Sequence, residues 1–198
     1  MAKTSVARQQ LIEAAAKLFR RKGYAASGLN YIVEESHTPK GSLYHYFPDG
    51  KEQLALEVLA YAGERALRTM RSLYDPGAEP GHVLIAYGEL VSGWMAKSRF
   101  RDGCPVATAL LELAATHTAV ASVGVKVFDS WSEVFATSLV QRGVSRERAQ
   151  RLASVAISAF EGALIQSRVN KSDKPIRDAA TVMAETFRHA ARESIAAA

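Results

Sequence analysis

The segment from Ser27 to Lys51 constrains the fold of this chain more than any other stretch of it. Its sequence is SGLNYIVEESHTPKGSLYHYFPDGK. Leu29, Ile32 and Val33 follow the spacing i, i+3, i+4, which places three apolar side chains on one face of a helix. The segment therefore predicts a helix of about two turns that packs against another part of the chain.

A second short helix is predicted directly after the first. The polar residues 36–38 interrupt the first helix, and Thr38 and Pro39 suit the N-cap and the first position of the next one. Leu43 and Phe47 are four residues apart and can point inward together. The polar and small residues of this second helix point largely outward: Lys40, Gly41, Ser42, Tyr44 and His45.

Two short helices joined by a tight turn form a helix-turn-helix, which in DNA-binding proteins places its second helix in the major groove. The second helix here has little to bury, and Gly41 leaves room on its outward face for the close approach of a partner. Both features favour a DNA-binding head. The alternative is an αα-corner with an ordinary solvated face.

Lys51 follows the turn residues Pro48, Asp49 and Gly50, and falls in the first turn of the next predicted helix. A positive charge at this position opposes the helix dipole. A phosphate bound beside the helix N-terminal amides would compensate for it, so Lys51 is a candidate phosphate ligand. The alternative is a tolerated surface lysine.

The charge and the cysteine content suit a DNA-binding protein of the cytoplasm. The 198 residues carry a formal net charge of +5, which fits one phosphate-binding face and not a polycation. Cys104 is the single cysteine, so no intrachain disulfide can form and a reducing compartment is expected. We find no signal-peptide pattern and no apolar run near the roughly 18 residues of a membrane span, so we expect no membrane partner.

Helical periodicity continues to the end of the chain, without a strand pattern or an internal repeat. The predicted fold is all-α with about nine helices: a three-helix head with the helix-turn-helix, and a C-terminal helical bundle. We expect a DNA-binding domain over 1–50 and a ligand-binding and dimerisation domain over 51–198, connected by a long helix over 51–73. The other expected helices run from a cap at Thr4 to about 22, and over 82–97, 104–115, 120–142, 145–169 and 175–190.

Three motifs resemble the TetR family of transcriptional regulators. The sequence TPKGSLYHYF followed by KEQL is similar to the family's recognition region, in which a Leu-Tyr-x-x-Phe block ends the third helix and a lysine opens the fourth. The spacing in FPDGKEQL, and the segment GCPVATALLELA at 103–114, resemble the LmrA/YxaF-like subgroup. The resemblance covers the head by motif and the whole chain by length and helical pattern.

The resemblance implies a ligand-responsive transcriptional repressor, released from a palindromic operator by a small, largely apolar molecule. Its implied partners are double-stranded operator DNA, a small-molecule effector and a second copy of the chain, without a cofactor or a metal. Residues of the second short helix would read base edges, its tyrosine and Lys51 would hold phosphates, and Ser27 and Thr38 would be weaker backbone contacts. The implied DNA-binding residues are Ser27, Thr38, Lys40, Gly41, Ser42, Tyr44, His45 and Lys51.

The resemblance also implies an effector cavity in the C-terminal region, lined by aromatic and apolar residues. Glu112 and His117 are its candidate polar anchors, along with Glu89 and Glu133, and an ordinary surface or partly buried position is the alternative for each. Core packing is the alternative for each aromatic residue. The candidate ligand-binding residues are Trp94, Phe100, Cys104, Leu110, Glu112, Leu113, His117, Phe128, Trp131 and Phe135.

Small residues in the last two predicted helices allow a close approach of helices. The resemblance implies that these helices pair with their copies in a homodimer, and an intrachain core is the alternative. The candidate interface residues are Ala156, Phe160, Ala163, Leu164, Met183 and Phe187.

Enzymatic activity is not expected from this sequence. The five histidines are scattered without the HExxH spacing, and neither a phosphate-binding glycine loop nor a G-x-S-x-G motif is present. The alternative function is a helical adaptor that binds other proteins through the same faces and has no specific affinity for DNA.

Overall fold

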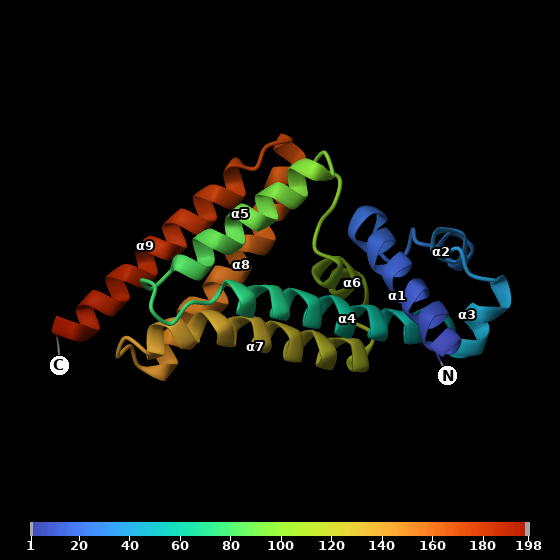
Figure 1. The fold of residues 1–198 in the computed structure, drawn as a ribbon, viewed down its shortest axis with the longest axis horizontal. Coiled ribbons are helices and arrows are strands. Elements are labelled where there is room, and N and C mark those ends of the chain that lie inside the picture. The colour runs from blue at the N-terminus through green and yellow to red at the C-terminus, as the bar shows by residue number, and fades with distance from the viewer. Residues whose placement is uncertain (1, 197–198) are drawn as a thin grey trace. The chain divides into compact units, whose positions relative to one another are not determined.

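The computed structural model describes residues 2–196, with side chains from residue 6 onward. Over this range the chain forms nine α-helices and no β-strand, which confirms the all-α prediction (Figure 1). The helices are α1 (Ala2–Lys22), α2 (Leu29–Ser36), α3 (Lys40–Tyr46), α4 (Gly50–Leu73), α5 (His82–Lys97), α6 (Pro105–Leu113), α7 (Thr118–Val140), α8 (Arg146–Asn170) and α9 (Lys174–Ala196).

The head, α1–α3, is held together by apolar side chains at helical spacing. Leu11 and Phe19 of α1, Ile32 of α2, and Leu43 of α3 with Phe47 just after it are all fully buried. The prediction that Leu43 and Phe47 turn inward together is therefore confirmed. Burial of these large side chains is the main force that fixes such short helices, because isolated helices of this length are not stable in water.

The turn between α2 and α3 is tighter than the sequence suggested. His37 ends α2 in the left-handed conformation with φ 52°, and its N–H donates to Glu34 O at 3.2 Å. Pro39, not Thr38, is the N-cap of α3. The predicted Thr38 cap is thus one residue off, and the predicted Thr4 cap is wrong because α1 begins at Ala2 and includes Thr4.

The described chain divides into two compact units. The head unit comprises the residues up to Glu64 together with Cys104–Val127, and the bundle unit comprises Arg65–Gly103 together with the residues from Phe128 onward. This division differs from the predicted boundary at residue 50, because α4 and α7 are continuous helices that begin in one unit and end in the other. The helix α6 belongs to the head unit, where it packs against α1.

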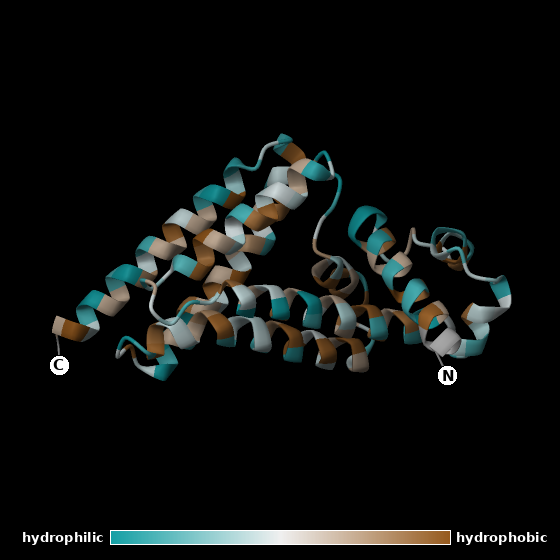
Figure 2. Ribbon diagram, in the orientation of Figure 1, coloured by the Kyte–Doolittle hydropathy of each residue, from teal (hydrophilic) through white to brown (hydrophobic). Residues whose placement is uncertain are grey.

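The bundle unit is built around α5, α8 and α9, which lie side by side (Figure 1). The ring of Phe160 lies 5.3 Å from that of Tyr87 and 6.4 Å from that of Phe135, so these three aromatics form part of the core. At Gly88 an added Cβ would come within 2.6 Å of the Cβ of Ala180, which shows how closely α5 approaches α9. Apolar and polar residues alternate along α8 and α9 at helical spacing (Figure 2).

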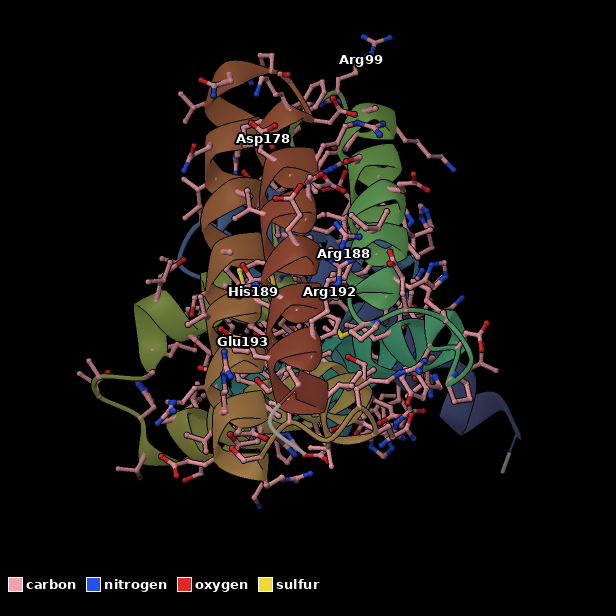
Figure 3. All side chains as sticks on the ribbon, turned by 90° about the vertical axis from the view of Figure 1, so that its left-hand side faces the viewer. Arg99, Asp178, Arg188, His189, Arg192 and Glu193 are labelled. Carbon is pink, nitrogen blue, oxygen red and sulfur yellow. The ribbon has the colours of Figure 1, made fainter. Side chains whose placement is uncertain are left out.

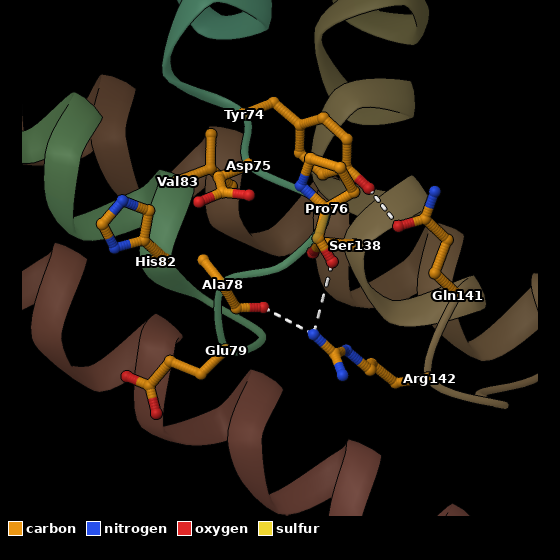
Figure 4. Close-up of a pocket in the computed structure, with 10 residues that line it drawn as sticks. All are labelled: Tyr74, Asp75, Pro76, Ala78, Glu79, His82, Val83, Ser138, Gln141 and Arg142. Carbon is orange, nitrogen blue, oxygen red and sulfur yellow. Dashed lines mark hydrogen bonds between the residues drawn. The ribbon is translucent and has the colours of Figure 1, made fainter.

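The C-terminal end of α4 is anchored within the bundle unit. The hydroxyl of Tyr74 donates to Gln141, and the guanidinium of Arg142 donates to Ala78 O at 2.7 Å and to Pro76 O at 3.4 Å (Figure 4). These bonds enclose a cavity of only about 10 Å³, room for a single water molecule. Burial raises the pKa of Tyr74, so its hydroxyl stays a neutral hydrogen-bond donor. The loop after α4 is therefore fixed by side-chain to backbone contacts.

Candidate DNA-binding site

The outward face of α3 has the composition that a recognition helix needs. Lys40 and His45 are exposed, and the side chain of Tyr44 is 57% exposed. Over the described residues, no hydrogen bond or ion pair engages the ammonium of Lys40 or the hydroxyl of Tyr44. A Cβ added at Gly41 would meet no atom within 4 Å, so the backbone there is open to a partner. Ser42 is half-buried.

Two predicted DNA contacts are buried instead. Ser27 is fully buried and its hydroxyl donates to Gly23 O at 2.6 Å. Thr38 is 8% exposed and its hydroxyl pairs with that of Ser36 at 2.8 Å. Both hydroxyls therefore satisfy the turns at the two ends of α2, and the expectation that they face phosphates is not met in this structure.

Lys51 lies in the first turn of α4, as predicted, and is half-buried. Its Nζ donates to Ala25 O at 3.2 Å and lies 4.2 Å from the centroid of the Tyr24 ring. Burial lowers the pKa of Lys51, and the nearby carboxylate of Glu112 opposes that shift. An ammonium carries three N–H donors. The bond to Ala25 uses one of these donors, and the others can donate hydrogen bonds to a phosphate.

The structure adds an exposed pair that the sequence did not predict. Tyr31 on α2 is 57% exposed, and the Nζ of Lys22 lies 5.0 Å from its ring centroid. The only sequence signal for this pair is a basic residue at the end of one helix and an aromatic residue off the apolar stripe of the next. Such a pair could supply a further cation and a hydroxyl to the surface of the head.

The candidate ligand-binding residues are divided between the two units. Trp94, Phe100, Phe128, Trp131 and Phe135 lie in the bundle unit, and the other candidates lie in the head unit. None of the candidate residues lines the cavity beside Tyr74 or the groove on α8 and α9. Trp94 is 46% exposed, whereas Trp131 and Phe135 are buried core residues.

The candidate polar anchors are engaged inside the head unit. The carboxylate of Glu112 accepts hydrogen bonds from the backbone N–H groups of Tyr24 and Ala25, at 2.7 and 2.6 Å. His117 Nε2 lies 3.6 Å from a carboxylate oxygen of Glu52 in the first turn of α4. Both side chains therefore connect the α6 region to the head and to α4, and are not free to anchor a ligand in this conformation.

Three of the candidates on α6 have ordinary packing roles. Cys104 is the N-cap of α6, where its sulfur accepts a hydrogen bond from the Ala107 N–H at 3.4 Å. Leu113 is buried, and Leu110 covers Gly124 so closely that a Cβ there would come within 2.5 Å of its side chain. The crossing of α6 and α7 therefore depends on a glycine at position 124.

The candidate dimer residues are mostly core residues of one chain. Phe187 is fully buried, Phe160 and Ala163 are each 4% exposed, and Met183 is 7% exposed. Ala156 is likewise buried, and Leu164 is half-buried. The largest of these side chains fill the contacts of α8 and α9 with α5 and with each other, which favours the alternative of an intrachain core for them.

A different face of α8 and α9 carries exposed apolar and small residues. A groove of about 820 Å³ is lined there by residues that include Ala159, Gly162, Ala179 and Val182. Val182 is 58% exposed. Figure 3 views α9 with Asp178, a further groove residue, and the ion-paired residues His189 and Glu193 labelled along it.

The described residues contain no group of three or more His, Cys, Asp or Glu side chains placed to hold a metal ion. None of the described helices combines the length and the hydropathy that crossing a bilayer requires.

The chain matches two protein-family models along its length. The model for bacterial regulatory proteins of the tetR family matches residues 11–58. The model for the C-terminal domain of LmrA/YxaF-like transcriptional regulators matches residues 80–182.

Proteins of similar sequence are transcriptional regulators. The uncharacterized HTH-type regulator YxaF of Bacillus subtilis (strain 168) is 35% identical over 169 residues, which cover 85% of this chain and 88% of YxaF. The HTH-type regulator LmrA of the same organism is 30% identical over 169 residues, 85% of this chain and 90% of LmrA. The HTH-type transcriptional repressor DhaR of Mycobacterium sp. (strain GP1) is 26% identical over 193 residues, 94% of each chain.

Solved structures with the same fold include regulators of this kind. The regulatory protein TetR from Rhodobacter sphaeroides superposes with a TM-score of 0.81 at 23% identity, covering 91% of this chain and 98% of that one. A TetR transcriptional regulator from Chloroflexus aurantiacus J-10-FL gives a TM-score of 0.75 at 27% identity, over 93% and 96% of the two chains. With α2 and α3 as its DNA-binding helix-turn-helix, the chain belongs to the tetR family of bacterial transcriptional regulators, in the LmrA/YxaF-like group.

Proposed function

We propose that this regulator is a repressor that binds a palindromic operator as a homodimer and leaves it when a small, largely apolar molecule binds. The observation that carries the DNA-binding part is the exposed face of α3. Lys40 and His45 are available there to base edges and Tyr44 to a phosphate, and the backbone at Gly41 is open. Lys51, at the start of α4, is the proposed second phosphate ligand.

A homodimer is supported by the exposed groove of α8 and α9 and by the symmetry of DNA. TetR regulators act as dimers. We place the interface of this chain on the groove around Gly162, Ala179 and Val182, in which small and apolar residues permit helices to approach closely. A twofold dimer presents two recognition helices to successive turns of the major groove, about 34–36 Å apart, or to multiples of that spacing.

Repression is supported by the name of a relative, and release by an effector is what the family resemblance implies. DhaR is named a transcriptional repressor, and its sequence aligns with 94% of this chain. Phe100 and Phe128, both half-buried in the bundle unit, remain the proposed effector contacts. An effector can release the operator only by binding more tightly to the form of the protein that does not bind DNA. Because the operator lies on the chromosome, we place the protein in the cytoplasm.

The test is selection of DNA by the purified full-length protein. Sheared genomic DNA of the source organism is incubated with the protein and excess unrelated competitor, and the retained fragments are sequenced. We expect enrichment of fragments that share an inverted repeat, with half-site centres about one helical turn or a multiple of it apart. Retention no better than that of the competitor DNA contradicts the regulator and favours the adaptor function.

The Lys40→Ala variant separates base reading from backbone contact in the same selection. Loss of a side chain that reads base edges should relax the preference at one position of each half-site, while the remaining phosphate contacts keep the protein on DNA. An unchanged preference with uniformly weaker binding would reassign Lys40 to the phosphate backbone. Compounds that release the wild-type protein from the selected fragment then identify the effector class.

A further inference from the structure

Glu112, at the C-terminal end of α6, holds the loop that joins α1 to α2. Its two carboxylate oxygens accept separate hydrogen bonds, from Tyr24 N–H at 2.7 Å and from Ala25 N–H at 2.6 Å. Glu112 is 88 residues away from Tyr24 in the sequence. Bonds from neutral N–H groups to an ionised carboxylate are stronger than bonds between neutral groups. We call this pair of bonds the Glu112 clamp.

The backbone of the loop is shaped for the clamp. Gly23 has φ +89°, which non-glycine residues rarely adopt, and a Cβ added there would lie 2.6 Å from Glu112 Oε1. Gly23 thus turns the chain after α1 so that two successive N–H groups face α6, and it leaves room for the carboxylate. Without that carboxylate the two donors would have no protein acceptor among the bonds of this loop.

The start of α4 joins the same loop from another direction. Lys51 Nζ donates to Ala25 O at 3.2 Å and lies against the ring of Tyr24. That ring in turn packs edge-on against Phe19 in the core of the head, with 5.4 Å between centroids. The backbone of Tyr24 and Ala25 is therefore held by α6 through two N–H groups and by α4 through the Ala25 carbonyl.

A second, longer contact joins the segment after α6 to the start of α4. His117 precedes α7 and its Nε2 lies 3.6 Å from a carboxylate oxygen of Glu52, next to Lys51. Its Nδ1 lies 2.8 Å from Thr116 Oγ1 and 3.2 Å from Leu113 O, which orients the ring. The end of α6 and the start of α4 are thus connected directly as well as through the loop.

We propose that Glu112 is a positioning residue that couples the end of α6 to the helix-turn-helix. A displacement of α6 would pull the two loop amides with it and would shift α2, which begins four residues after Ala25 and packs on α3. The same displacement would change the surroundings of Lys51. This inference rests on the proposed function, since it concerns how DNA binding responds to changes elsewhere in the chain.

Coupling between two sites is reciprocal, so the coupling between α6 and the helix-turn-helix can be measured without an effector. If α6 and the head influence each other, DNA binding must alter α6 by the same coupling free energy. The experiment is hydrogen exchange of the full-length protein, free and bound to the operator fragment obtained by the selection above. We expect DNA to change exchange of the amides at 111–118 by about fivefold or more, the lower range of known couplings, besides protecting the amides of α3.

Two variants test whether Glu112 carries the coupling. Glu112→Gln keeps the shape but replaces one acceptor oxygen by an NH₂ group that faces an N–H donor, and Glu112→Asp keeps the charge but withdraws it by one methylene. In both we expect the DNA-induced change at 111–118 to fall below about twofold, with α3 still protected by DNA. Glu133→Gln is the matched control, because Glu133 also receives two N–H bonds, from Arg146, but lies in the bundle unit.

The outcomes separate this inference from the proposed function. If α3 is protected but the amides at 111–118 do not respond in the wild type, the coupling does not exist. If both Glu112 variants keep the wild-type response at 111–118, Glu112 serves only the stability of the head. If DNA protects no amide of α3, the proposed operator binding is itself contradicted, and the coupling inference falls with it. Circular dichroism of each variant verifies that its helices are intact.

Discussion

Lys17 and Glu35 join α1 to α2 by an ion pair on the partly exposed side of the head. The hydrogen bond from Lys17 is the main cause that lowers the pKa of Glu35. Partial burial opposes the shift, and electrostatic interactions with Lys17, Arg21 and His37 add to it. A carboxyl whose pKa is lower in the folded chain stabilises the fold above its unfolded pKa, and that contribution is lost as the pH falls through the folded pKa.

Lys17→Met should therefore lower the free energy of unfolding at pH 7 by less than about 1 kcal/mol, because the pair is partly exposed and solvent screens it. The difference from the wild type should shrink as the pH falls below about 5 and through the folded pKa of Glu35, because the carboxyl is then protonated in both states. Urea denaturation at several pH values measures this difference in the free energy of unfolding. Lys22→Met is the control, since Lys22 contacts an aromatic ring and, among the described residues, no carboxylate. A difference that stays constant with pH would remove Glu35 from the explanation.

Single-residue roles were the least predictable part of the molecule. The sequence predicted Lys40, Tyr44 and His45 on the outward face of α3, because helical spacing alone decides that face. It could not predict that Ser27 and Thr38 are buried, because a hydroxyl that closes a turn looks the same in sequence as one that meets solvent. Glu112 was expected to anchor a ligand. Its actual partner, Tyr24, is 88 residues away in the sequence, and no local pattern indicates such a contact.

At the scale of elements, the sequence predicted the helices well because most of them carry an apolar stripe at helical spacing. The bounds of α5 agree with the predicted range, and Ser145 caps α8 as expected, with its hydroxyl accepting from the Arg148 N–H. The apolar stripe of a helix does not reveal which neighbouring helix it packs against. For α8 and α9 the large apolar residues were expected at a dimer interface, and they pack within one chain instead.

Phe160→Ala tests this revised assignment for α8. The ring of Phe160 is 4% exposed and packs between those of Tyr87 and Phe135, so its removal leaves a cavity in the bundle unit. We expect a loss of about 3–5 kcal/mol in the free energy of unfolding, measured by urea denaturation. Val125→Ala, at a 60% exposed position of α7, should change stability by less than about 0.5 kcal/mol. Equal, small effects of the two substitutions would place Phe160 outside the core.

At the scale of the whole molecule, the proposed homodimer would present two recognition helices to one operator. The groove of α8 and α9 around Val182 is the surface that we assign to the contact between copies. Its small residues let helices of two chains approach, and its exposed valine would be removed from water by the partner. Burial of such apolar surface is the usual driving force for stable homodimers.

Val182→Glu should separate the dimer, because dimerisation would bury two unpaired carboxylates. Sedimentation analysis should show a monomer for this variant and a dimer for the wild type, with equal helix content in both. Val125→Glu introduces the same charge at an exposed valine outside the groove and should remain a dimer. A dimer that persists in Val182→Glu would move the interface to another face of the chain.

The most direct test of the account is the salt dependence of binding to the selected operator fragment and to a scrambled fragment of equal length. We predict that the protein binds the operator at least about a thousandfold more tightly than the scrambled fragment. The logarithm of the affinity should fall linearly with the logarithm of the salt concentration, and Lys51→Ala should reduce that slope by about one unit for each head. Equal affinities for the two fragments, with a slope that Lys51→Ala leaves unchanged, would contradict sequence-specific DNA binding through this helix-turn-helix.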